Sequence, residues 1–177
     1  MKLTIITINY NSSENTIKLL ESLKNQTDKD FGVIVVDNNS DDIDQLMDYK
    51  TTETNIIYIK NDWNLGYSGG NNVGIKKALE NGSDWILLLN NDTWVESSFA
   101  ERLRAYLEGK EGIIGMALDE GDRIAYAGQI QWLKPTLPHI TTLNVVRAKS
   151  VDKLYAIGGA MLIHKSVFDK IGLLDEN

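Results

Sequence analysis

Asparagine and aspartate side chains cluster directly after four stretches of apolar residues. The stretches cover residues 3–8, 31–36, 55–60 and 85–89, and the polar residues behind them are Asn9, Asn11, Asp37, Asn38, Asn61, Asp62, Asn90, Asn91 and Asp92. Carboxylate and amide oxygens can bind cations, and amides can also donate hydrogen bonds to a ligand. Asparagine is a common turn residue, so each cluster alone fits a loop. Four clusters at equivalent positions favour a ligand site.

The apolar run that ends at Asp92 is the best candidate for the central element. Residues 85–89 are apolar without polar alternation, which is typical of a strand buried on both faces of a parallel sheet. Ligands of open α/β sheets bind outside the carboxyl ends of the strands, where Asp92 would lie. Taken alone, Asp92 fits the N-cap of a following helix equally well.

Helical patterns follow each of these strands. Asn11 with Glu14 resembles a capping box for a helix to about Lys24, and Asp41, Asp42 and Asp44 form an acidic, solvated helix start. Two further helices carry apolar residues around positions 75–79 and 99–107, the first closed by Asn81-Gly82. Four βα units predict an α/β fold with a doubly wound, mostly parallel sheet flanked by helices.

The pattern changes beyond Glu108. Strands are predicted within residues 113–117, 124–133 and 155–163, a loop around Pro135 and Pro138, and a short helix from a Ser166 cap to Ile171, stopped by Gly172. These segments predict a small β extension in the C-terminal half of a single domain.

Composition excludes several classes of protein. The 177 residues contain no cysteine, so neither a disulfide scaffold nor Cys-ligated zinc is possible. A net charge of −7 argues against nucleic acid as a partner. No apolar run approaches the ~20 residues of a membrane span, which predicts a soluble or at most peripheral membrane protein.

The glycine-rich stretch 66–74 suggests phosphate binding, but its spacing differs from the known phosphate loops. It follows the third strand, matches neither G-x-G-x-x-G nor G-x-x-x-x-G-K, and leads into a predicted helix only after Asn72. The first strand ends without a glycine. A dinucleotide-binding oxidoreductase is therefore disfavoured.

Taken together, these motifs resemble the family two inverting glycosyltransferases of the GT-A fold, especially their rhamnosyltransferase-like branch. The resemblance covers nearly the whole chain in order and is carried by residues 8–12, 35–40, 64–74, 89–92 and 159–163. It implies one GT-A domain over residues 1–177, with a nucleotide- and donor-binding half (1–93) and an acceptor-side half (94–177). The implied activity is transfer of a sugar, rhamnose being one candidate, from a UDP- or dTDP-sugar to a hydroxyl acceptor with inversion.

The resemblance also implies roles for individual residues. Asp92 corresponds to the last acid of a metal-binding Asp-any-Asp motif whose first acid is replaced by Asn90, so one carboxylate and the donor diphosphate would share Mg²⁺ or Mn²⁺. Asp37 would accept N3–H of uracil or thymine, and Tyr10 would stack on the base unless it is a packing residue. The expected nucleotide and donor contacts are Thr7, Asn9, Tyr10, Asn11, Asp37, Asn38, Asn39, Asn64, Gly66, Asn71, Asn90, Asn91, Asp92, Gly159 and Ala160.

The catalytic base is expected outside the given sequence. Family members continue past the Asp175-Glu176 pair to a Glu-Asp pair that supplies the base, and this sequence ends at Asn177 before that pair. Asp175 and Glu176 are thus the catalytic candidates within the sequence, although neither is expected to replace the base fully.

Other roles stay open at this point. A nucleotide-sugar-binding module without transfer activity and a nucleotidyltransferase are the alternative functions. The implied acceptor is a glycan or lipid-linked glycan in polysaccharide biosynthesis, with a cytoplasmic location that includes the inner face of the membrane. Donor sugar, linkage and oligomeric state are not predicted.

The remaining aromatic and histidine residues carry no recognisable motif. His139 and His164 are expected on the surface or in packing. The four tryptophans are expected in core or rim packing, with Trp132, which precedes the prolines, as the best candidate for a sugar platform.

Overall fold

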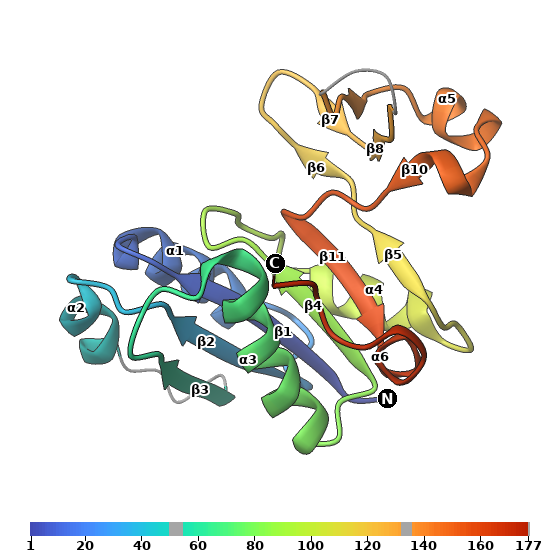
Figure 1. The fold of residues 1–177 in the computed structure, drawn as a ribbon. Helices are drawn as coiled ribbons and strands as arrows, with labels where there is room; N and C mark the ends of the chain where they lie inside the picture. Colours follow the sequence, from blue (N-terminus) through green and yellow to red (C-terminus); the bar gives the residue numbers. More distant parts are fainter. Residues whose placement is uncertain (50–54, 132–135, 177) are drawn as a thin grey trace.

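A computed structural model describes residues 1–49, 55–131 and 136–176. The N-terminal part alternates strands and helices as predicted (Figure 1). Its elements are β1 (Leu3–Asn9), α1 (Ser13–Lys24), β2 (Phe31–Asp37), α2 (Ile43–Asp48), β3 (Asn55–Lys60), α3 (Gly66–Glu80), β4 (Trp85–Leu89) and α4 (Phe99–Leu107).

The central sheet has six strands in the order β3-β2-β1-β4-β11-β5. The first four run parallel, whereas β11 (Ala160–His164) and β5 (Ile113–Gly115) are antiparallel to their neighbours. Asn9 pairs in register with Asp37 at the carboxyl ends of β1 and β2. The doubly wound, mostly parallel sheet is confirmed, and its parallel strands deliver their polar ends to one edge.

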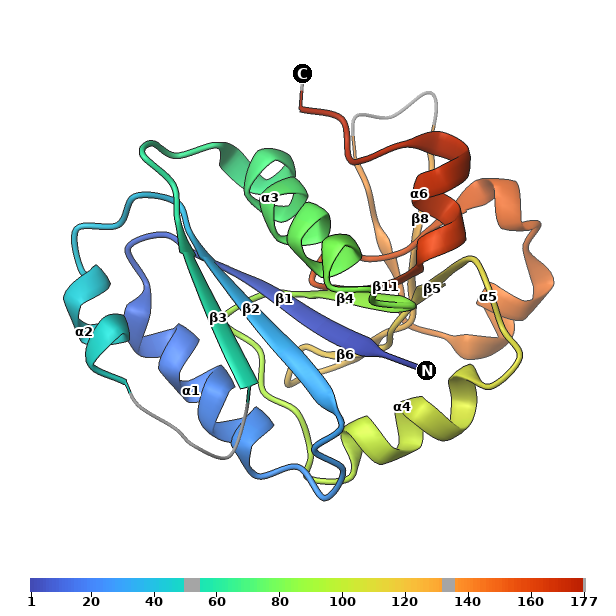
Figure 2. The same ribbon diagram turned by 90° about the horizontal axis from the view of Figure 1, so that it is seen from below.

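Helices cover both faces of the sheet (Figure 2). Alternate residues of β1 show why: Ile5 is buried under α1 and α4, whereas Ile6 is buried under α3 and α6 (Lys165–Ile171). Side chains of a strand alternate between its two faces, so a central strand must be apolar throughout. β4, buried at all five positions, meets this requirement most completely.

The glycine-rich stretch is helical from Gly66 onward, earlier than predicted. A Cβ at Gly70 would lie 2.9 Å from Nδ2 of Asn38, and one at Gly74 would lie 2.6 Å from Ile6 Cγ2. These glycines therefore let the first turns of α3 approach β1 and β2 closely. The sequence suggested a loop because glycine usually weakens a helix, and this packing constraint overrides that preference.

Several helix ends differ from the predicted caps. Asn11 has a positive φ of 48° and lies outside α1, whose N-terminal Ser13 donates its hydrogen bonds to another residue. Asp42 accepts hydrogen bonds from the Ser13 backbone N–H (2.8 Å) and hydroxyl (2.9 Å), so this acid caps α1 and is not simply a solvated start of α2. His164, and not Ser166, caps α6 by accepting from the Ser166 N–H.

The predicted β extension forms a small lobe beside the main sheet (Figure 1). It contains a two-stranded and a three-stranded antiparallel sheet. Its elements are β6 (Leu118–Asp119), β7 (Ile124–Ala125), β8 (Ala127–Gln129), β9 (His139–Ile140), α5 (Leu143–Ala148), a 3₁₀ turn (Val151–Lys153) and β10 (Leu154–Tyr155). Trp132 and Pro135 lie outside the described residues.

The sheet includes strands from both predicted halves of the domain. β11 and β5 follow residue 94 and pair beside β4, which precedes it. A division of function at residue 93 stays a prediction. Within the described ranges, none of the helices is long and apolar enough to cross a membrane.

Candidate functional site

A cavity of about 300 Å³ lies at the carboxyl ends of the parallel strands. It is bounded by residues that follow β1, β2 and β4 and by the first turns of α3, in agreement with the rim predicted from the sequence. The lining residues are Ile8, Tyr10, Asn38, Asn64, Gly66, Tyr67, Asn71, Leu89, Asn90, Asn91 and Asp92.

Asp92 is the acidic side chain that lines this cavity. It lies exposed in the turn after β4, and its carboxylate makes no hydrogen bond or ion pair with the described residues. Neighbouring Asn91 is anchored, because its Nδ2 donates to Thr16 Oγ1 at 2.9 Å. Asp92 is therefore held by a fixed turn while its charge stays available to a ligand, which disfavours the alternative of a simple helix cap.

The chemistry of the cavity fits a hard divalent cation only when a ligand completes the coordination. In the described part of the chain, no group of three acidic, histidine or cysteine side chains could hold a metal ion. Mg²⁺-type cations are commonly held by one or two carboxylates together with substrate phosphates and water. Asp92, flanked by the amides of Asn90 and Asn91, matches this arrangement.

A buried polar network lies beneath the rim, centred on Asn9. The side chain of Asn9 is fully buried; its Nδ2 donates to Asp37 Oδ1 (2.8 Å), Ser40 Oγ (3.0 Å) and Ser13 Oγ (3.1 Å), and its Oδ1 accepts from Thr16 (2.7 Å). The second oxygen of Asp37 accepts from the Ser40 N–H at 3.0 Å. Both side chains are thus engaged within the protein.

This network engages Asn9 and Asp37 within the protein. Asp37 is 3% exposed, and neither residue is part of the cavity lining, so their direct contacts with a nucleotide stay predictions. Asn9 connects β1 to β2 and, through Thr16, to Asn91 beside Asp92. Thr7 is likewise buried and outside the cavity lining.

Asn11 and Asn39 are turn residues and not lining residues. Both adopt positive φ, a conformation that asparagine tolerates better than most residues. The Oδ1 of Asn11 accepts from the Asp41 N–H at 2.8 Å, which ties the turn after β1 to the turn after β2. These two asparagines therefore act as loop-forming residues.

Asn38, Asn64, Gly66 and Asn71 line the cavity as expected. Asn38 donates to the Gly66 carbonyl at 3.0 Å, and Asn64 Oδ1 accepts from the Gly66 N–H at 2.8 Å. Asn71 donates to the Tyr67 carbonyl at 3.0 Å. These amides fix the start of α3 against β2 and form one wall of the cavity.

Tyr10 and Tyr67 contribute the aromatic surface of the cavity. Tyr10 is 49% exposed, which argues against the alternative that it is a packing residue. The hydroxyl of Tyr67 donates to the Gly158 carbonyl at 2.6 Å, and burial raises the pKa of this phenol. Tyr67 was given no role from the sequence, since its contact joins segments 91 residues apart.

Gly159 and Ala160 position the end of β4. The Gly159 carbonyl accepts from the Asn90 N–H at 2.9 Å, and Ala160 pairs with Leu89 across the antiparallel ladder. Neither residue lines the cavity. Both residues support the end of β4 at Asn90, and their donor contacts stay predictions.

The C-terminal acids lie away from the cavity lining. Glu176 Oε1 accepts from Asn72 Nδ2 at 2.6 Å. The Asn72 side chain also donates to the Leu174 carbonyl and accepts from the Leu174 N–H. Neither Asp175 nor Glu176 is among the lining residues. Glu176 is thus part of an anchor that fastens the C-terminal segment to α3.

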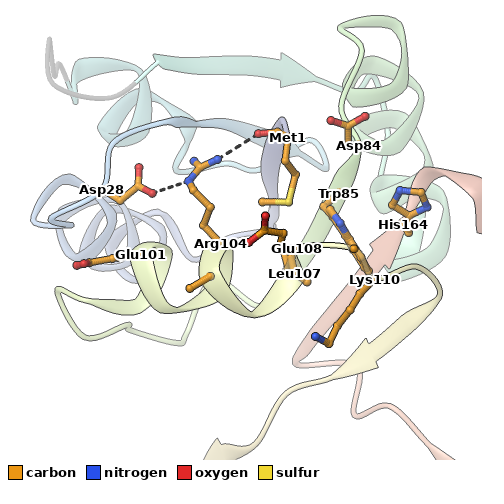
Figure 3. A pocket seen from close by; sticks show the side chains of 12 residues that line it. Met1, Asp28, Asp84, Trp85, Glu101, Arg104, Leu107, Glu108, Lys110 and His164 are labelled. Atoms are coloured by element: carbon orange, nitrogen blue, oxygen red, sulfur yellow. Dashed lines mark hydrogen bonds and ion pairs between the residues drawn. The ribbon is translucent and has the colours of Figure 1, made fainter.

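A larger cavity of about 720 Å³ lies at the opposite end of the strands (Figure 3). Two of its acidic side chains, Asp28 and Asp84, form ion pairs. Arg104 donates to Asp28 at 2.6 Å and to the Met1 carbonyl at 3.1 Å, and Lys165 contacts Asp84 at 2.7 Å. His164 packs edge-on against the ring of Trp85, with ring centroids 4.9 Å apart. This end is a junction between elements that are joined by these contacts.

Comparison with known proteins gives a consistent family assignment. Residues 4–172 match the model of Glycosyl transferase family 2. The chain is 31% identical over 193 aligned residues to the low-salt glycan biosynthesis hexosyltransferase Agl10 of Haloferax volcanii, covering 99% of this chain and 56% of that protein. It is 26% identical to the dTDP-rhamnosyl transferase RfbF of Shigella flexneri, covering 97% and 56% respectively.

Solved structures show the same fold at low sequence identity. S. aureus TarS 1-349 in complex with UDP superposes with a TM-score of 0.73 at 19% identity, over 99% of this chain and 51% of that one. The mannosyltransferase PcManGT of Pyrobaculum calidifontis, in complex with GDP-Man and Mn²⁺, gives a TM-score of 0.70 at 13% identity, over 99% and 48%. The chain spans about half the length of these relatives. The sequence match and the shared fold thus lead to the same assignment. The chain belongs to glycosyl transferase family 2 and has the GT-A fold.

Proposed function

We propose that the carboxyl-end cavity binds a UDP- or dTDP-sugar and that the protein transfers its glycosyl group to a glycan hydroxyl with inversion. The observation that carries this proposal is Asp92, an unpaired carboxylate held at the end of the central strand in a cavity of neutral amides and tyrosines. A nucleotide diphosphate offers the complementary groups: a flat base, hydroxyls and phosphates that can share a cation with the carboxylate.

Recognition of the base is proposed to involve the cavity wall, and a direct contact of Asp37 with the base stays a prediction. Tyr10, half exposed, offers a face for stacking, and Asn38, Asn64 and Asn71 line the same cavity. Asp37 supports this wall from below through Asn9 and Ser40. The relative named as a dTDP-rhamnosyl transferase and the neighbour solved with UDP favour a pyrimidine base, whereas the neighbour with GDP-Man is the competing precedent.

Asp92 is the residue proposed to hold Mg²⁺ or Mn²⁺ jointly with the donor diphosphate, with Asn90 and Asn91 beside it. A bound divalent cation would neutralise the departing diphosphate as the sugar–oxygen bond breaks. The Mn²⁺ in the structure of the mannosyltransferase neighbour supports this assignment. The amides of the cavity walls would orient the leaving group through hydrogen bonds.

Inversion requires a base that removes the proton of the attacking hydroxyl. Glu176 is bonded to Asn72, and neither it nor Asp175 lines the cavity, so the proposal assigns the base to neither. The resemblance to the family predicts a later Glu-Asp pair for this step, and that stays a prediction. The acceptor, a glycan or lipid-linked glycan, also stays a prediction. So does the cytoplasmic location, including the inner membrane face, which fractionation of producing cells tests.

Calorimetric titration of UDP, dTDP and GDP with Mn²⁺ tests the donor assignment. We expect UDP or dTDP to bind more tightly than GDP, and a reversed order would contradict a pyrimidine site. Product analysis with a donor sugar then separates the functions. Nucleoside diphosphate released only with an acceptor supports transfer, binding without turnover indicates a binding module, and pyrophosphate release indicates nucleotidyl transfer.

A further inference from the structure

Trp94 is the most exposed aromatic side chain in the described part of the chain, at 73%. Tryptophan usually buries most of its large apolar surface, so an indole left in water points to a surface that has a partner. The sequence predicted Trp94 in core or rim packing, which its exposure contradicts. Its position, two residues after Asp92, places it beside the candidate donor site.

The backbone around Trp94 is anchored on both sides. Before it, the N–H and hydroxyl of Thr93 donate to the Asn90 carbonyl at 3.3 and 2.5 Å. After it, the Val95 N–H donates to Ser22 Oγ at 3.3 Å, and Val95 packs against the core under α1 and α4. The exposure of Trp94 is therefore built into a fixed segment and does not come from a loosely held loop.

The exposure of residues 92–96 alternates along the chain. Asp92, Trp94 and Glu96 are exposed, whereas Thr93 and Val95 are half-buried. Trp94 and Asp92, which lines the cavity, are thus both exposed at positions two residues apart. Glu96 pairs with Arg102 at 3.5 Å.

We propose that Trp94 is the stacking platform for the acceptor sugar, an inference that rests on the proposed glycosyl transfer. The C–H groups on one face of a pyranose ring are apolar and can cover the indole, while the ring hydroxyls stay accessible to Asp92, Glu96 and water. An acceptor held there lies next to the cavity in which the donor is proposed to bind. Trp94 would thus select glycan acceptors without contacting the nucleotide.

Fluorine NMR of protein labelled with 5-fluorotryptophan tests the platform directly. The Trp94 signal is assigned from its disappearance in Trp94→Phe, and the probes are methyl α-L-rhamnoside, methyl β-D-glucoside and methyl N-acetyl-β-D-glucosaminide. We expect at least one glycoside to shift the Trp94 signal with saturation and to leave Trp63 unshifted, since Trp63 is also exposed (64%) but follows β3. No shift of Trp94 with any of the three at 100 mM overturns the proposal.

Kinetics on the protein separate this proposal from the proposed function. Trp94→Ala should raise the acceptor KM roughly fivefold, since aromatic stacking is typically worth about 1 kcal/mol. Trp94→Phe should restore most of that loss, and UDP affinity should stay within about twofold. Trp63→Ala is the matched control. Equal acceptor KM values for Trp94→Ala and Trp63→Ala overturn the proposal that Trp94 is the acceptor platform, even where transfer occurs. Absence of transfer in the parent contradicts the proposed function instead. In that case the NMR result decides whether Trp94 binds a sugar.

Discussion

The two ends of the parallel strands differ in how their charges are satisfied. At the amino ends, Arg104 is bound by Asp28 and Asp30, and Lys165 by Asp84. At the carboxyl ends, the acid Asp92 has no partner among the described residues, and the surrounding groups are neutral. The amino end has the larger cavity, about 720 against 300 Å³. The carboxyl end is the candidate site because an exposed, unpaired acid lies there among neutral amides and tyrosines, and not because of its volume.

The carboxyl end itself has two layers with different tasks. Below lies the buried layer of Asn9, Asp37 and Thr16, in which hydrogen bonds join β1, β2 and the turn before Asp92. Above lies the exposed layer of Tyr10 and Asp92 that can meet a ligand. Mutations in the lower layer should act mainly on stability, and mutations in the upper layer mainly on binding.

Asn9→Leu should have the largest effect on stability. It removes the donor to Asp37 and the acceptor for Thr16 from a fully buried position, and each buried polar group left without a partner costs about 1–3 kcal/mol. We expect the free energy of unfolding, measured by urea denaturation, to fall by about 3 kcal/mol. Asn15→Leu is the control, because Asn15 makes one hydrogen bond at a half-buried position. Similar losses in both variants would contradict a special role for Asn9.

Asp37→Asn should have an intermediate effect. Each carboxylate oxygen of Asp37 accepts from an N–H group, and an amide would present its own NH₂ to one of those donors. We expect a loss of about 2 kcal/mol in the free energy of unfolding. Asp62→Asn makes the same chemical change at an exposed position and should stay within about 0.5 kcal/mol. If the unfolding free energy is unchanged while UDP affinity falls, Asp37 contacts the base after all.

Arg104→Met should have the smallest effect, and it tests the amino end. The Arg104 guanidinium, and then the Asp30 N–H, hold the pKa of Asp28 below its ordinary value. A lowered folded-state pKa stabilises the fold above the ordinary aspartate pKa of about 3.9, and this contribution is lost as pH falls through the lowered value.

We therefore expect Arg104→Met to cost about 1 kcal/mol at pH 7, with the difference from the parent shrinking below about pH 4. Denaturant titrations at pH 7, 5, 4 and 3 measure it. The pair Lys18–Glu14, with both side chains more than half exposed, provides the control variant Lys18→Met, for which a smaller loss is expected. A difference that grows as pH falls would contradict the assignment to Asp28.

The architecture of the sheet was predictable because it depends on local patterns. Five consecutive apolar residues placed β4 in the centre, and the polar residues after each strand marked the correct edge. The start of α3 was not predictable, since it depends on the close approach of Gly70 to Asn38, 32 positions earlier in the chain. Likewise, Asp42 caps a helix other than its own.

The site was predictable in its position but only partly in its residues. The pattern that marks a strand end cannot distinguish an exposed amide that lines the cavity, such as Asn64, from a buried one outside the lining, such as Asn9. That difference arises from side-chain packing between strands. For the same reason the sequence could not show that Tyr67 reaches Gly158 or that Trp94 stays exposed.

Titration of UDP into the parent protein and Asp92→Asn, each with and without Mn²⁺, tests the central claim most directly. An amide is a poorer ligand for a hard cation than a carboxylate. The account predicts that Mn²⁺ raises UDP affinity in the parent by about tenfold or more, equivalent to about 1.4 kcal/mol, and that the two curves coincide in Asp92→Asn. The control Asp62→Asn should keep the full Mn²⁺ effect. An equal Mn²⁺ effect in the parent and in Asp92→Asn would contradict the assignment of Asp92 as the metal-binding residue of the donor site.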